Sequence, residues 1–149
     1  MNIGIIGLGY VGLPLSLTFA ESGVTVLGLD LDPSKIEDLS RGRSYIKHIS
    51  ANRIKKVVDQ KLFSASTDFS KVKNLDAIII CVPTPLNKFR EPDISYVIKS
   101  GEAIAPHLSK ETLVVLESTT YPGTTEDELR VAIEANSNMK AGIDFHLAY

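Results

Sequence analysis

The feature that most constrains this chain is a set of three closely spaced glycines near its start. Gly7, Gly9 and Gly12 follow a short apolar run, residues 3–6, and precede a stretch whose apolar residues have helical spacing. A Gly-x-Gly-x-x-Gly turn between a strand and a helix is typical of α/β proteins with a parallel sheet. We therefore expect the chain to open with a strand, a tight turn and a helix.

Each glycine has its own role in a turn of this kind. Gly7 permits the tight turn out of the strand, and Gly9 removes the side chain that would keep the backbone away from a phosphate. Gly12 lets the helix pack close to the strand. The helix N-terminus directs unpaired N–H groups and the positive end of its dipole at the same place. The pattern predicts a site for the pyrophosphate of a dinucleotide.

An acidic residue completes the pattern. A second apolar run, residues 24–29, ends at Asp30, about 20 residues past the glycines. A carboxylate at this place can accept hydrogen bonds from both hydroxyls of an adenosine ribose. A 2′-phosphate would meet the same carboxylate, so NAD is favoured over NADP as the cofactor. Lys35 lies one helical turn beyond Asp30. It is either a residue of the cofactor site or a solvated lysine on the helix surface. A glycine-rich turn without a ligand is the alternative for the whole pattern.

Composition excludes several other classes of protein. The 149 residues suit one domain, and a net charge of −2 gives no electrostatic reason to expect nucleic acid or an anionic membrane as a partner. No apolar run approaches the ~20 residues of a membrane span, and the first residues lack the basic region of a signal peptide. The single cysteine allows no internal disulfide and no zinc cluster, so no metal site is predicted. The cytoplasm is the expected compartment.

Strands and helices alternate along the rest of the chain. Apolar periodicity and turn residues predict helices over residues 14–21, 34–39, 51–61, 94–104 and 126–135, with a helical turn at 68–73. Further strands are predicted at 62–66, 77–82, 113–116 and 143–149. With right-handed crossovers, five or six strands give a doubly wound parallel sheet of Rossmann type, most simply in the order 3-2-1-4-5-6, with helices on both faces. One domain, residues 1–149, is expected.

Polar loops follow two of the buried strands, at the sheet edge where ligands bind in such folds. Pro83-Thr84-Pro85 ends one strand, and Thr84 is a candidate cofactor contact or a polar turn residue. Residues 117–125 form a hydroxyl-rich loop after the next strand. Cys81 is interpreted as a small buried hydrophobic residue and not as a nucleophile. His48, in an irregular segment, is either a surface residue or a ligand contact.

Three motifs resemble those of a known family, the UDP-glucose/GDP-mannose dehydrogenases, which are nucleotide-sugar 6-dehydrogenases. They are GLGYVGLP at residues 7–14, CVPTP at 81–85 with PD at 92–93, and EST at 117–119 with PGTT at 122–125. The resemblance covers essentially the whole chain. The segment SYIKHI at residues 44–49 looks closer to the branch that oxidises UDP-N-acetylglucosamine or UDP-N-acetylmannosamine.

The resemblance implies a two-step oxidation of the sugar C6 alcohol to a carboxylate with two NAD⁺. It implies that the turn from Gly7 to Gly12, including Gly9, Tyr10 and Val11, binds the pyrophosphate, that Asp30 binds the ribose, and that Lys35 lies beside it. It further implies that Val82, Pro83 and Thr84 line the nicotinamide side and that Ser118 contacts the cofactor. Thr119 would sit beside the reacting sugar and help to order a catalytic water.

The chain differs from this family in length. Family members have several hundred residues, and their catalytic cysteine and lysine, their dimerising domain and their UDP-binding domain lie in later parts. We therefore expect an N-terminal NAD-binding domain that is inactive alone and that acts on a UDP-sugar together with those later domains. The full-length protein is expected to form a homodimer or a larger assembly. Two alternatives stay open: another Rossmann dehydrogenase, of the hydroxyacid or hydroxyacyl-CoA type, and a stand-alone NAD-binding regulatory module.

Overall fold

Six parallel strands form a single sheet in the computed structural model, which describes residues 1–149. Their order is β3-β2-β1-β4-β5-β6, and every neighbouring pair runs parallel. The strands are β1 (Asn2–Ile6), β2 (Thr25–Leu29), β3 (Phe63–Ser66), β4 (Ala77–Ile80), β5 (Leu113–Leu116) and β6 (His146–Ala148). The predicted doubly wound fold and its strand order are confirmed.

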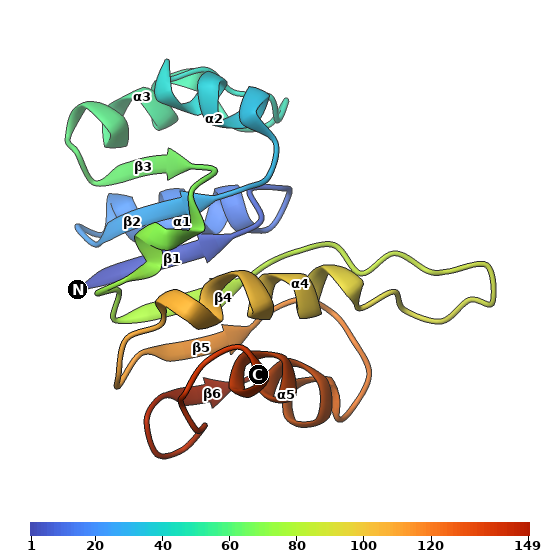
Figure 1. Ribbon diagram of the computed structural model, residues 1–149. Helices are drawn as coiled ribbons and strands as arrows, with labels where there is room; N and C mark the ends of the chain where they lie inside the picture. The colour runs from blue at the N-terminus through green and yellow to red at the C-terminus, as the bar shows by residue number, and fades with distance from the viewer.

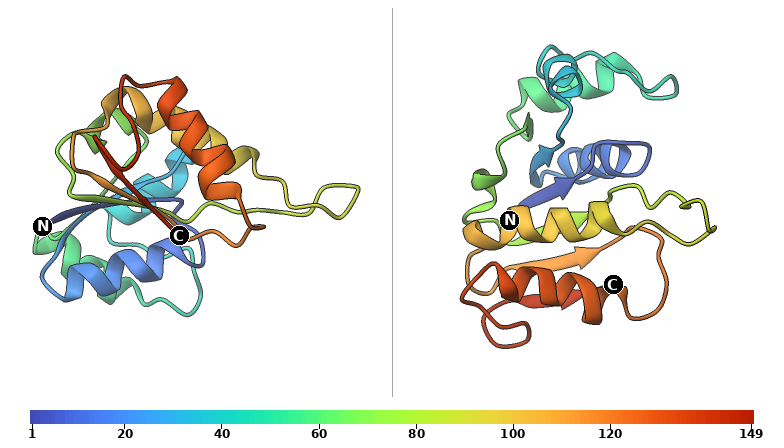
Figure 2. Two further views of the ribbon diagram at one scale, coloured as in Figure 1. Left: turned by 90° about the horizontal axis from the view of Figure 1, so that it is seen from below. Right: turned by 45° about the vertical axis from the view of Figure 1, so that its right-hand side comes forward.

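Helices connect the strands and cover both faces of the sheet (Figure 1). In the left view of Figure 2, which is seen from below, α1 lies on one side of the sheet, and α4 and α5 lie on the other. The helices are α1 (Gly12–Glu21), α2 (Pro33–Ser40), α3 (Ala51–Asp59), α4 (Ser95–Ile104) and α5 (Arg130–Ala135), with the 3₁₀ turns η1 (Phe69–Val72) and η2 (Ala105–His107) and the π-helical segment η3 (Thr124–Leu129). None of these helices has the length and apolar character that a membrane span requires.

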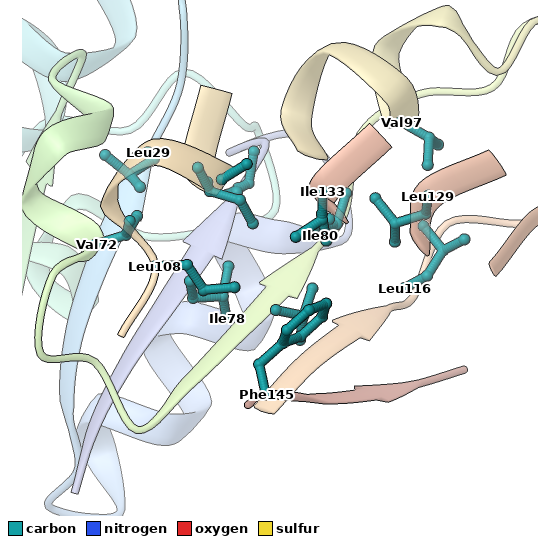
Figure 3. Packing of buried hydrophobic residues seen from close by; sticks show 14 residues of the cluster. Leu29, Val72, Ile78, Ile80, Val97, Leu108, Leu116, Leu129, Ile133 and Phe145 are labelled. Atoms are coloured by element: carbon teal, nitrogen blue, oxygen red, sulfur yellow. The ribbon is translucent and has the colours of Figure 1, made fainter. Parts of the chain in front are cut away.

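Each face of the sheet carries its own hydrophobic core. Ile3 and Ile5 of β1 belong to the cluster under α1 and α3. Ile78 and Ile80 of β4 belong to the cluster under α4 and α5, which Figure 3 shows. Ile79, between them, packs against the opposite cluster. Because β4 is buried on both faces, its sequence is continuously apolar instead of alternating.

All six strands point the same way in Figure 1, so the loops that follow them gather along one edge of the sheet. The glycine-rich turn follows β1, Asp30 follows β2, and the two polar loops of the sequence follow β4 and β5. The fold therefore brings together the segments that carry the sequence motifs.

The predicted helix over residues 126–135 differs from the structure in its start and its form. It begins at Thr124, and its first six residues are π-helical before α5 continues from Arg130. Gly123 precedes it with φ at +96°, and its carbonyl accepts from the N–H of Asp127 at 2.7 Å. The buried Thr124 hydroxyl donates to the carbonyl of Tyr121, which fixes the entry to this turn.

Two further boundaries are corrected. The last strand was expected over residues 143–149, yet only His146–Ala148 pair with β5. Residues just before it form a turn in which the Asp144 carboxylate accepts from the N–H of Lys140 at 3.0 Å. The helix expected over residues 51–61 ends at Asp59, because Lys61 turns the chain with φ at +58°.

The loop between β4 and α4 projects away from the body of the domain (Figures 1 and 2). It contains an antiparallel bridge between Leu86 and Pro92. The Asn87 side chain braces it, because its amide oxygen accepts from the N–H groups of Phe89 and Glu91. The loop therefore has internal structure of its own.

Candidate functional site

The glycine-rich turn has the conformation that the sequence predicts. Gly7 follows β1 with φ at +91°, and a Cβ there would lie 2.7 Å from the carbonyl oxygen of Cys81. A Cβ on Gly12 would clash with the carbonyl oxygen of Gly7, because α1 starts directly against the end of β1. A Cβ on Gly9 would meet nothing within 4 Å. The turn is thus tightly packed beneath Gly7 and Gly12 and open above Gly9.

The start of α1 has unpaired hydrogen-bond donors. No protein acceptor takes the backbone N–H of Gly9, Tyr10, Val11 or Gly12, and the first bond of the helix runs from Leu13 N–H to the Gly9 carbonyl. No acidic side chain lies in the first turn to neutralise them. Free N–H groups at the positive end of a helix dipole make a site for an anion such as a phosphate.

Asp30 lies beside this turn, immediately after β2. Its Oδ2 accepts from the N–H of Leu8 at 2.8 Å and from the Lys35 ammonium at 2.9 Å, and its Oδ1 accepts from the N–H of Asp32 at 3.0 Å. A carboxylate has about four acceptor positions, so a position on Oδ1 is left for a ligand hydroxyl. The structure places Lys35 against Asp30, whereas a freely solvated lysine was the alternative interpretation.

A cavity of about 430 Å³ opens between the ends of β1 and β2 and the helix α4. This volume lies within the range of small-molecule sites. Asp30 and Lys35 line it on one side, and Val82 and Pro83 of the β4 loop also reach it. The remaining lining residues are Ile6, Gly7, Leu29, Leu31, Asp32, Phe69, Tyr96, Lys99, Ser100 and Ala103.

Part of this cavity lining was not predicted from the sequence. Tyr96, Lys99, Ser100 and Ala103 occupy one stripe of α4, at positions i, i+3, i+4 and i+7. The adjacent stripe of α4, with Val97, Gly101 and Ile104, is buried in the core. The small side chains at the third and fourth positions of the missed stripe were the available sign that this face borders a hollow.

The loops after β4 and β5 are tied to each other by two hydroxyl groups. Thr84 Oγ1 donates to the carbonyl of Thr119 at 2.5 Å, and Ser118 Oγ donates to the carbonyl of Val82 at 2.7 Å. Ser118 is buried, whereas the Thr119 side chain is exposed and has no hydrogen-bond partner. The structure thus brings Val82, Thr84, Ser118 and Thr119 together at the sheet edge, with Thr119 presented to solvent.

The irregular segment 43–50 lies against the glycine-rich turn. The Tyr45 hydroxyl donates to the carbonyl of Leu8 at 2.6 Å, and the His48 ring stacks on Tyr10 with centroids 6.2 Å apart. Burial, followed by the nearby negative charge of Asp30, raises the pKa of the half-buried Tyr45. Sequence reasoning proposed His48 as a possible ligand contact but did not single out Tyr45.

Cys81 does not have the environment of a nucleophile. It is half-buried directly after β4, and desolvation together with the Glu117 carboxylate raises the pKa of its thiol to about 12. The expectation of an unreactive cysteine agrees with this geometry. No cluster of three or more histidine, cysteine, aspartate or glutamate side chains is arranged to hold a metal ion.

The fold and this site together define a dinucleotide-binding domain of the Rossmann type. The sequence model of the UDP-glucose/GDP-mannose dehydrogenase family, NAD binding domain, matches residues 1–149. The chain therefore belongs to the UDP-glucose/GDP-mannose dehydrogenase family, and its cofactor is NAD. The open space above Gly9 and the unpaired N–H groups of α1 fit the pyrophosphate of this cofactor.

Individual relatives agree with the family assignment. The chain is 36% identical to the protein CapL of Staphylococcus aureus over 99% of its length, and 34% identical to the UDP-N-acetyl-D-glucosamine 6-dehydrogenase of Salmonella typhi over its whole length. A crystal structure of a ternary complex of GDP-mannose dehydrogenase from Pseudomonas aeruginosa matches 99% of the chain with a TM-score of 0.95 and 33% identity. The chain spans about a third of each of these proteins: 34%, 34% and 35%.

Proposed function

We propose that residues 1–149 serve as the N-terminal NAD-binding domain of a longer nucleotide-sugar 6-dehydrogenase. The proposed reaction oxidises the C6 alcohol of a UDP-hexose or UDP-N-acetylhexosamine to a carboxylate with two NAD⁺. The observation that carries the proposal is the set of unpaired N–H groups from Gly9 to Gly12 beside the Asp30 carboxylate. The share of about a third of each relative supports the presence of further domains in the working enzyme.

In this proposal the two ends of the cofactor bind to different elements. The backbone of the turn, formed by Gly7, Gly9, Tyr10, Val11 and Gly12, holds the pyrophosphate. Asp30 and Lys35 hold the adenosine ribose at the rim of the cavity. The cavity itself holds the adenosine half of the cofactor, and α4 closes the far side of the cavity.

The nicotinamide half lies toward the loops after β4 and β5 in this proposal. Val82, Pro83 and Thr84 line this side, and Ser118 keeps the two loops together through its hydrogen bond to Val82. When bound, NAD⁺ supplies the acceptor for the hydride that leaves C6. Thr119, whose hydroxyl is exposed and unpaired, is suited to hold a water molecule or a sugar hydroxyl beside C6.

The proposed substrate branch is that of the UDP-N-acetylhexosamines. The relative from Salmonella typhi carries the name UDP-N-acetyl-D-glucosamine 6-dehydrogenase, and the segment 44–49 resembles that branch. We further propose that the whole enzyme is cytoplasmic and works as a homodimer or larger assembly. The other open function, a stand-alone NAD-binding regulatory module, is the competing hypothesis; family membership argues against an enzyme of the hydroxyacid or hydroxyacyl-CoA type.

A calorimetric titration of this chain with NAD⁺ and NADP⁺, repeated on Asp30→Ala, tests the cofactor site. We expect NAD⁺ to bind in preference to NADP⁺ and the substitution to weaken it. The increase in NADH absorbance in the presence of UDP-N-acetylglucosamine then tests whether further domains are required for turnover. Turnover by residues 1–149 alone would show that no further domain is required, and absence of turnover by the full-length gene product with any UDP-sugar would favour the regulatory module.

A further inference from the structure

Leu8, the residue between the first two glycines of the turn, is held on both sides by distant side chains. Its N–H donates to Asp30 Oδ2 at 2.8 Å, and its carbonyl accepts from the Tyr45 hydroxyl at 2.6 Å. Its own side chain is fully buried and packs so closely over Gly28 that a Cβ there would lie 2.8 Å from Leu8 Cδ2. Both peptide groups that flank Leu8 are therefore fixed in orientation.

The orientation of the second peptide group decides where a donor of the turn points. In a planar trans peptide, the carbonyl of Leu8 and the N–H of Gly9 point in opposite directions. Since Tyr45 draws the carbonyl toward the segment 43–50, the Gly9 N–H points away from that segment. This N–H has no acceptor in the protein, and the space above Gly9 is open.

The segment that carries Tyr45 is itself well anchored. Ile46 and Ile49 are buried in the core under α1, and the Ser44 hydroxyl donates to the carbonyl of Ile46 at 2.9 Å. Burial raises the pKa of Tyr45, so its hydroxyl keeps its proton and remains a donor at every physiological pH. The stacking of His48 on Tyr10 is a second contact between this segment and the turn.

We propose that Tyr45 is a positioning residue of the cofactor site, which holds the Leu8 carbonyl so that the Gly9 N–H is directed at a phosphate of the dinucleotide. This inference rests on the proposed function, because it requires a phosphate at the start of α1. Leu8 also links two parts of the site, since Asp30 holds its N–H from the ribose side and Tyr45 holds its carbonyl from the opposite side.

The test is Tyr45→Phe, which removes one hydroxyl and keeps the ring that packs around it. We expect the dissociation constants of NAD⁺ and ADP to rise about three- to tenfold, the range for loss of one hydrogen bond, and that of adenosine to stay unchanged. A purely structural role would weaken all three ligands alike. Tyr149→Phe is the matched control, because the Tyr149 hydroxyl is exposed and makes no hydrogen bond; all its dissociation constants should equal those of the unsubstituted chain.

A second readout does not depend on ligand affinity. In ¹H–¹⁵N spectra, Tyr45→Phe should shift the free Gly9 amide resonance and reduce its further shift on addition of ADP. An unshifted Gly9 amide, or equal weakening of ADP and adenosine, would overturn the role of Tyr45 while leaving the proposed function intact. Failure of the unsubstituted chain to bind NAD⁺ and ADP would overturn both the proposed cofactor site and this inference.

Discussion

The carboxylate of Asp30 and the ammonium of Lys35 form an ion pair of 2.9 Å at the rim of the cavity. The Asp30 side chain is only 11% exposed and the Lys35 side chain 31%. Asp30 offers hydrogen-bond acceptors to ribose hydroxyls. Lys35 carries a positive charge, which is paired with the Asp30 carboxylate in this structure. Within this one ion pair, Asp30 therefore favours NAD⁺ and Lys35 favours NADP⁺.

Asp30→Asn should narrow the preference for NAD⁺ over NADP⁺. The NAD⁺ dissociation constant is expected to rise about tenfold, because a charged acceptor becomes a neutral one. NADP⁺ should bind more tightly than before, since the carboxylate no longer repels a 2′-phosphate and Lys35 is free to attract it. Calorimetry with both cofactors measures the ratio. Asp59→Asn, which breaks an exposed ion pair with Lys55, is the control; an unchanged ratio in Asp30→Asn would show that Asp30 does not select the cofactor.

Alanine substitutions at two glycines should separate binding from folding. Gly9→Ala adds a Cβ in open space, so its thermal midpoint should stay within a few degrees of the unsubstituted chain while NAD⁺ affinity falls. Gly12→Ala forces the new Cβ against the carbonyl oxygen of Gly7, so both stability and binding should fall. Melting curves and titrations of the two variants check this, and unimpaired NAD⁺ binding by Gly9→Ala would remove the turn from the proposed site.

The central part of the site could be predicted from the sequence because its signals are local. The spacing of Gly7, Gly9 and Gly12 and the place of Asp30 after the second apolar run follow from one β-α-β unit. Tyr45 could not be found in this way. Its partner lies 37 residues away and is a backbone carbonyl, which has no sequence signature.

The fold was predictable for the same reason, whereas element ends were less so. Continuous apolar runs identified the buried strands, and the crossover rule then fixed their order. The π-helical start at Thr124 was not predicted, because it depends on a buried hydroxyl and on the turn at Gly123 and not on apolar periodicity. Periodicity predicted the helix over residues 94–104 but could not show that one stripe of α4 borders a cavity.

Ser118→Ala should destabilise the domain by about 1–2 kcal/mol. The hydroxyl is buried, and its loss leaves the carbonyl of Val82 without its donor at the junction of two loops. Urea unfolding followed by circular dichroism measures the change in free energy. Ser64→Ala, at an exposed position of β3, should change it by less than about 0.5 kcal/mol. If both variants unfold at the same urea concentration, the tie between the loops carries no stability.

The Cys81 thiol should resist alkylation in the folded chain. Its pKa is raised from 9.0 to about 12, so at pH 8 its thiolate fraction is about a thousandfold below that of the unfolded chain. Labelling with iodoacetamide should be at least about a hundredfold slower without urea than with it. The sign for stability follows: the protonated thiol is favoured in the folded state, so this contribution is complete below pH 9.0 and is lost as pH rises toward 12. Equal labelling rates in the two states would contradict the buried environment.

Ala103→Leu should block the cavity without disturbing the core. Ala103 lies on the stripe of α4 that lines the cavity, and Leu is about as good a helix former as Ala. The larger side chain occupies space that the adenosine half needs in the proposed site. We therefore expect adenosine, ADP and NAD⁺ all to bind at least about tenfold more weakly, with a thermal midpoint equal to or above that of the unsubstituted chain.

Glu102→Leu is the matched control for this substitution, because it places the same side chain one position earlier on an exposed part of α4, outside the cavity lining. Its ligand affinities should not change. The pattern also separates the cavity from the turn: Ala103→Leu weakens adenosine, whereas Tyr45→Phe spares it. If Ala103→Leu binds adenosine normally, the adenosine half does not lie against α4, and the cavity between β2 and α4 must be assigned another role.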